Sequence, residues 1–335
     1  MRRFVLSLFL LLALAGGGYT AYWFVLAHRI EAGLGPWADA QRAQGTTLAW
    51  QSVAMEGFPA AFRLRFTAAS ADGAKSLRYT ATAPVLLAEA RAWDLHHWRL
   101  TAPQGANLSL PDALLGFAGA DASGSASLDP AQGTSIAVSA NGIAGRGLAE
   151  GVQIAGAEAQ IDLPGRGPAS HTEPGLTASI RLTDLALPAP VQPFGKDIEE
   201  LNLAATLKGA LPPGKLHDAL EAWRQDGGTI ELTDGSLRWG ALVANASGTL
   251  ALDDKLQPIG ALTATLENHD AIVDAAVASG NLRARDAGLL KIVLGLMAKP
   301  GADGRKQLTL PVSLQNDHLY LGPAAIAALP RFRWE

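Results

Sequence analysis

Residues 61–67 read Ala-Phe-Arg-Leu-Arg-Phe-Thr, and this stretch decides the fold class. Phe62, Leu64 and Phe66 alternate with two arginines and a threonine, so an extended strand here carries apolar side chains on one face and polar ones on the other. The period of two predicts a sheet with one apolar and one wetted face. The same rhythm recurs at 201–208, 262–266 and 308–314.

Turn signals such as Asp72-Gly73, Asn141-Gly142 and Asp234-Gly235 separate the alternating runs, of which there are about 14 between residues 46 and 321. The 335-residue chain has 36 Gly and 19 Pro, which suits many short strands and turns. We therefore expect a mainly β (α+β) fold: a large curved antiparallel sheet or open β groove with a few short helices, preceded by one N-terminal transmembrane helix.

The N-terminal segment predicts that membrane helix. Arg2-Arg3 precede Phe4–Ala27, which contains no charged residue and would extend about 36 Å as a helix, enough to cross a bilayer core. Tyr19, Tyr22 and Trp23 lie toward its far end, where aromatic rings favour the membrane interface. The paired arginines favour a cytoplasmic N-terminus, so we expect a single-pass inner-membrane protein with its C-terminal body in the periplasm. A cleaved signal peptide ending near Ala13-Leu14-Ala15 is the alternative.

This organisation gives three parts: an anchor or signal peptide at 1–28, a stalk helix at 29–45, and a β-rich periplasmic domain at 46–335. Pro and Gly cluster at 188–195, which marks either a subdivision of that domain or a connection within one elongated sheet. The region 118–176 is rich in small residues and is interpreted as thin β structure at a sheet margin. Short helices are predicted at 215–225, 271–278 and 285–297. The last of these is apolar on both faces, so we expect it to pack against a sheet or to cover an apolar groove.

Composition and motifs argue against several functions. The chain has no Cys, so thiolate catalysis and Cys-ligated metals are excluded, and its net charge of −4 gives no field for nucleic acid. Residues 209–215 have the spacing of a phosphate-binding loop, but Pro212-Pro213 lack the N–H groups such a loop needs, so we interpret them as a turn. His96-His97 are strand neighbours whose side chains point to opposite faces and cannot readily share one metal ion. We therefore predict no catalytic, cofactor-binding or metal-binding residues, no cofactor, and a protein that is not an enzyme.

The stretch Trp50-Gln-Ser-Val-Ala-Met-Glu-Gly57-Phe58-Pro59, followed by the alternation at 62–66, resembles the opening of the domain-of-unknown-function 2125 family. That family is bacterial, membrane-anchored and uncharacterised. The resemblance extends over nearly the whole chain through further stretches, namely Trp223 with Gly227–Leu232, Leu237–Gly240, Gly248–Asp253, Gln257–Gly260, Leu319–Pro323 and Leu329-Pro330. Gly248–Asp253 and Gly260–Leu266 are also similar to strands of AsmA-like envelope proteins, which implies an envelope role linked to lipid movement or outer-membrane homeostasis.

Three functions follow as expectations. The first is an anchored β-rich protein that binds a lipid or another apolar ligand, with the 285–297 helix lining or covering the site. The second is a structural or scaffolding envelope protein that engages protein partners through sheet edges. The third is a periplasmic hydrolase, for which no site motif is present.

Overall fold

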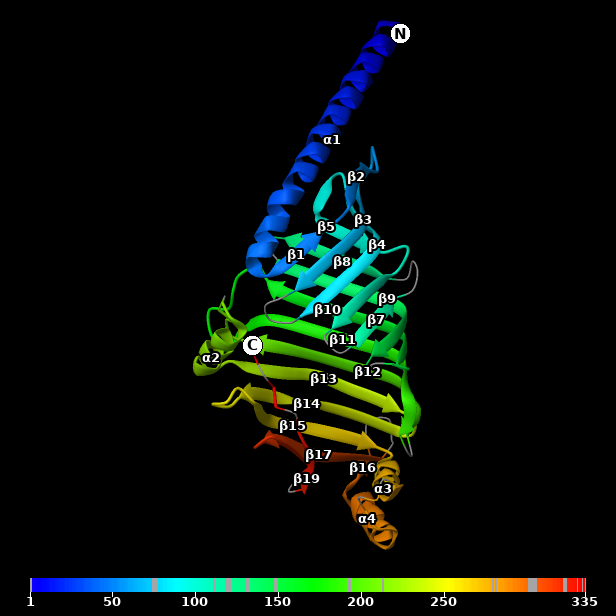
Figure 1. Ribbon diagram of the computed structural model, residues 1–335, viewed down its shortest axis with the longest axis vertical. Coiled ribbons are helices and arrows are strands. Elements are labelled where there is room, and N and C mark those ends of the chain that lie inside the picture. Colours follow the sequence, from blue (N-terminus) through cyan, green and yellow to red (C-terminus); the bar gives the residue numbers. More distant parts are fainter. Residues whose placement is uncertain are drawn as a thin grey trace.

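The computed structural model describes residues 2–73, 78–110, 113–117, 122–129, 133–147, 150–191, 194–212, 214–278, 280, 282–300, 306–321, 324–329, 331–332 and 334. It begins with α1 (Arg2–Gln44), one helix that contains both the expected anchor and the expected stalk. Gly45 follows with a φ of 103°, and its N–H donates to the carbonyl of Arg42 at 3.0 Å, which closes the helix end. The first half of α1 projects away from the rest of the molecule (Figure 1).

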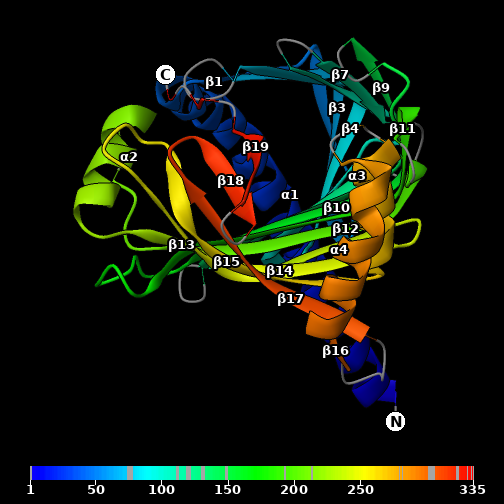
Figure 2. The same ribbon diagram turned by 90° about the horizontal axis from the view of Figure 1, so that it is seen from below.

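One antiparallel sheet of nineteen strands, counted over the described residues, follows α1. Its first nine strands are β1 (Thr46–Ala49), β2 (Ser52–Glu56), β3 (Ala61–Gly73), β4 (Tyr79–Arg91), β5 (Asp94–Thr101), β6 (Ala106–Leu110), β7 (Ala113–Phe117), β8 (Ser123–Asp129) and β9 (Gly133–Gly147). The others are β10 (Gln153–Pro164), β11 (Pro174–Val191), β12 (Gly195–Lys208), β13 (Thr229–Trp239), β14 (Leu242–Leu252), β15 (Pro258–Glu267), β16 (Lys299–Pro300), β17 (Lys306–Gln315), β18 (His318–Leu321) and β19 (Ala324–Ala328). The mainly β prediction is confirmed, and Figure 2 shows that the sheet is curved.

The sheet divides and rejoins near its head. β4 pairs with β5 through residues 87–91 and with β6 through residues 80–82. β9 brings the two branches together again, because it pairs with β8 through residues 133–139 and with β7 through residues 143–147. From β9 onward each strand pairs with the next in sequence as far as β15, which then pairs with β17.

Two expectations about the strands were wrong. The structure has more strands than the alternating runs indicated, because pieces as short as β16 and β18 show no readable period. The 118–176 region is not at a margin either: β9 pairs with β7 and β8 on one side and with β10 on the other. Its small side chains reduce the apolar signal without preventing backbone pairing. β11 and β12, the strands on either side of the Pro- and Gly-rich stretch, pair with each other, and Val191 lies opposite Gly195.

Three short helices interrupt the sheet, close to the predicted positions: α2 (Leu216–Gln225), α3 (His269–Ala278) and α4 (Ala284–Met297). The last one, which was expected to pack against a sheet or to cover an apolar groove, contacts β17 but leaves most of its apolar side chains exposed. Ala287 is the one buried residue among those described in α4, while Leu296 is 83% exposed. Figure 1 shows α3 and α4 at the end of the molecule opposite α1.

Small clusters take the place of one large core. Trp23 and Ala27 of α1 pack with Phe62 and Ala92, and Leu64, Phe66 and Ala88 form a neighbouring cluster. A third cluster, made of Leu220, Trp223, Leu252, Leu256 and the C-terminal Trp334, lies under α2. Between these clusters the middle of the sheet is a single layer: Ile180 on one face of β11 is 39% exposed, and Arg181 on the other face is exposed as well.

Candidate functional site

An apolar face runs the length of the sheet, and we define it by two cross-strand rows. The first row holds only apolar residues or glycine over twelve strands: Leu64, Ala88, Leu100, Gly124, Val138, Ala159, Ile180, Leu203, Gly235, Ala246, Ala264 and Leu310. At about 4.8 Å between neighbouring strands, this row follows a contour of about 50 Å.

The second row lies two residues along each strand, or three in β13 where the register shifts, and repeats the pattern: Phe62, Ala90, Trp98, Ala126, Ile136, Ile161, Ala178, Ala205, Leu232, Gly248, Leu262 and Val312. Beside the first row, on its other side, β9 to β17 continue with Ala140, Ala157, Leu182, Leu201, Leu237, Ala244, Leu266 and Leu308. The apolar face is therefore several side chains wide as well as long.

The apolar face is open in the middle and covered at its head. Ile180 and Leu203, a direct cross-strand pair, are 39% and 42% exposed. An uninterrupted apolar surface of this size, exposed to water, is unusual for a soluble protein. At the head, α1 lies over β3 and β4, where Trp23 stacks on Phe62 with ring centroids 5.0 Å apart.

A groove between the second half of α1 and the first strands encloses about 480 Å³. Its helix wall is Ile30, Leu34 and Trp37, and its sheet wall includes Leu64, Phe66 and Leu86. Trp98 and Leu100 also line the groove and are members of the two rows. Because the same side chains belong to both, the groove is the covered beginning of the apolar face.

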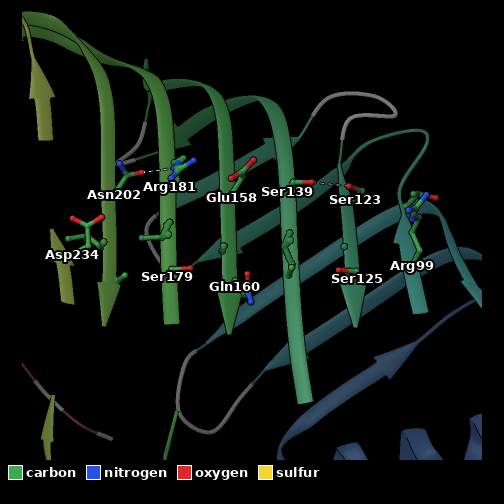
Figure 3. Close-up of a pocket in the computed structure, with 18 residues that line it drawn as sticks. Arg99, Ser123, Ser125, Ser139, Glu158, Gln160, Ser179, Arg181, Asn202 and Asp234 are labelled. Atoms are coloured by element: carbon green, nitrogen blue, oxygen red, sulfur yellow. Dashed lines mark hydrogen bonds between the residues drawn. The ribbon is translucent and has the colours of Figure 1, made fainter. Parts of the chain in front are cut away.

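The opposite face of the same strands is polar (Figure 3). One of its rows runs Thr101, Ser123, Ser139, Glu158, Arg181, Asn202 and Ser236. Arg181 Nε donates to Asn202 Oδ1 at 2.8 Å, and the hydroxyls of Ser123 and Ser139 lie 2.9 Å apart. A hollow of about 620 Å³ lies over these residues. Some of its polar groups therefore bond one another along the sheet, as expected of a solvated face.

Charge pairs continue the polar face toward α1. Arg65 Nε donates to Glu56 Oε1 at 2.8 Å, and this hydrogen bond lowers the pKa of the Glu56 carboxyl below its usual range. Arg63 Nε donates to Glu89 Oε2 at 2.6 Å. Both arginines come from the stretch 61–67, whose Phe and Leu members face α1. Along β3, therefore, charged side chains on the polar face alternate with large apolar side chains on the apolar face.

The two motifs considered for chemistry lie on β5 and on the approach to α2. His97 Nδ1 is 2.9 Å from Oδ2 of Asp94, and this hydrogen bond lowers the pKa of Asp94. Residues 209–212 lead toward α2, and the N–H of Gly209 donates to the carbonyl of Glu173 at 2.9 Å. Over the part of the chain that the structure describes, no three His, Asp or Glu side chains are grouped to hold a metal ion.

Sequence reasoning missed the connection between Trp98, Leu100 and the groove. The signal was present, because Trp98 and Leu100 alternate with His97 and Arg99. The extent of the rows depends on strand register, which fixes which residues meet across the sheet and cannot be read from single strands.

A family model decides the affiliation of the chain. The model described as "Uncharacterized protein conserved in bacteria (DUF2125)" matches residues 23–330. The chain belongs to the DUF2125 family. In this DUF2125 chain the match begins at Trp23, the residue that joins α1 to β3, and includes both apolar rows. No curated protein and no solved structure matches the chain.

Proposed function

We propose that this protein is anchored in the bacterial inner membrane by α1 and binds the acyl chains of a lipid on its apolar face, in the periplasm and without catalysis. The observation that carries the proposal is the continuity of the apolar face. An apolar path of about 50 Å begins beneath the helix that would cross the membrane and continues outward over open strands.

The anchor has two supports. α1 has the length and apolarity to cross a membrane. It also runs without a break through Ala13–Gly18, where a signal peptide would be cut, and from Tyr19 onward it packs on the body. Arg2 and Arg3 favour keeping the N-terminus in the cytoplasm, which supports a body on the periplasmic side.

Lipid is the ligand that the site chemistry favours. The helix wall of the groove begins at Ile30, seven residues after Trp23, which is about 10 Å along the helix from the aromatic cluster. The acyl chain of a lipid that leaves the bilayer would therefore contact apolar side chains of the groove after a short distance. Each methylene taken out of water contributes about 0.8 kcal/mol, so a long open apolar surface suits an acyl chain better than a compact ligand.

A second candidate function, a scaffold for a protein partner, is supported by α4. Leu289, Ile292 and Leu296 lie three or four residues apart on this helix and are among its most exposed side chains. An exposed apolar stripe of this kind fits a groove on another protein.

One crosslinking experiment separates the two functions. A photoreactive benzoylphenylalanine is placed at position 180, 179 or 296 in the full-length protein, and intact cells are irradiated. We expect phospholipid adducts from position 180 and none from position 179, since these neighbours lie on opposite faces of β11. Discrete protein adducts at 180 and 296 without lipid would reject lipid binding in favour of a scaffold.

A further inference from the structure

Two hairpin tips lie beside α1. The first joins β2 to β3 through residues 57–60, and the second joins β4 to β5 through residues 92–93. The N–H of Ala92 donates to the carbonyl of Ala60 at 3.0 Å, so the two tips form one unit. Figure 1 shows the β2–β3 hairpin pointing along α1 toward its N-terminal half.

The tips are fixed at a defined height on α1. The Phe58 ring lies 5.4 Å from Trp23 and 5.7 Å from Phe24, measured between centroids. Trp23 Nε1 donates to the carbonyl of Ala61 at 3.2 Å, and the Tyr19 hydroxyl donates to the carbonyl of Pro59. These contacts leave the tips little freedom to move along the helix.

That height coincides with the edge of the bilayer. A hydrocarbon core of about 30 Å takes about 20 helical residues, so a span that starts at Phe4 ends near Trp23. The tips contact Tyr19–Phe24, which form the last helical turn of such a span and enter the interface between hydrocarbon and water. Aromatic rings favour this depth because their apolar bodies leave water while their polar atoms remain in reach of it.

Each tip presents a large side chain that the body does not cover. Trp93 is 72% exposed and Phe58 is 47% exposed, and the exposed Arg91 adjoins the second tip. Two aromatic side chains on a surface next to a membrane span match a bilayer interface, and an arginine beside them suits lipid phosphate groups. We propose that the two tips insert Phe58 and Trp93 into the headgroup region of the same membrane, giving the body a second contact that sets its orientation.

The inference rests on the proposed anchoring, so its test includes a position that reports on the anchor alone. The chain has no cysteine, and single cysteines can therefore carry a nitroxide label without background. Labels are placed by Trp93→Cys, Phe58→Cys, Leu12→Cys within the span, and Gln160→Cys on the polar face. Full-length variants are reconstituted in vesicles of phosphatidylethanolamine and phosphatidylglycerol. Electron paramagnetic resonance then compares collision of each label with oxygen and with a water-soluble nickel chelate.

We expect the ratio of oxygen collisions to nickel collisions to be severalfold higher for the labels at 93 and 58 than for the label at 160. The label at 12 should give the highest ratio, because it lies deepest in the bilayer. Trp93 is largely exposed, so its variant folds and decides the matter even if Phe58→Cys disturbs packing. If the label at 93 collides with nickel as readily as the label at 160, while the label at 12 is protected from nickel, the inference is overturned and the anchor is left intact. Shielding of 93 from both relaxants would also overturn it, because a protein would then cover the tip. An aqueous reading at 12 would overturn the anchor itself.

Discussion

Replacing Ile180 with lysine and Leu203 with glutamate is expected to lower the phospholipid that co-purifies with the full-length protein at least about tenfold. The two residues face each other across β11 and β12 in the open middle of the apolar face. A charge against an acyl chain loses hydration without gaining a partner in the lipid, and only about 1.4 kcal/mol of lost binding free energy gives a tenfold effect.

The matched control uses the neighbouring cross-strand pair. Ser179 and Ala204 face each other on the polar side of the same two strands, so Ser179→Lys with Ala204→Glu adds the same charges to the same place in the fold. Opposite charges across an antiparallel pair are compatible with the sheet, and both variants should fold. Lipid is extracted from each purified protein and quantified by mass spectrometry. Equal loss of lipid in the two variants would mean that the apolar face is not the site.

Replacing Trp223 with alanine is expected to lower the free energy of unfolding by about 3–5 kcal/mol. The Trp223 side chain is 1% exposed and fills the cluster under α2, and its Nε1 donates to the carbonyl of Lys208 at 2.7 Å. A Cβ on Gly228 would stand 2.2 Å from the Trp223 ring, which shows how closely the backbone surrounds it. Truncation therefore leaves a cavity that the surroundings cannot close.

Trp93→Ala is the matched control, because it removes the same ring from an exposed site and should change stability by no more than about 0.5 kcal/mol. Both variants are unfolded by denaturant in mild detergent and followed by circular dichroism. A Trp223→Ala midpoint no lower than that of Trp93→Ala would contradict the placement of this ring in a core.

The sequence predicts the strands well where large residues alternate with polar ones, as in 61–67. It fails where the alternation is between small residues. Ser123–Ser127 carry only Ser, Gly and Ala, yet β8 supplies Gly124 and Ala126 to the two rows. Backbone pairing by neighbouring strands orders such a segment without any large apolar side chain of its own.

The sequence predicts that an apolar face exists, but not which residues of different strands meet on it. Periodicity indicates that an apolar face exists, while pairing register decides that Ile180 meets Leu203 and Ala159. The position of α4 was missed for a related reason. A helix with apolar residues on every side is predicted to be buried, but α4 stays largely exposed because it contacts the sheet mainly at β17, and its own sequence does not encode the extent of that contact.

The central claim, that the apolar face holds lipid, is tested most directly by native mass spectrometry of the unaltered full-length protein released from gently extracted membranes. We predict a reproducible population whose added mass equals one or more phospholipids and which loses that mass on collisional activation. A protein that remains free of lipid over a range of mild detergents would contradict the claim.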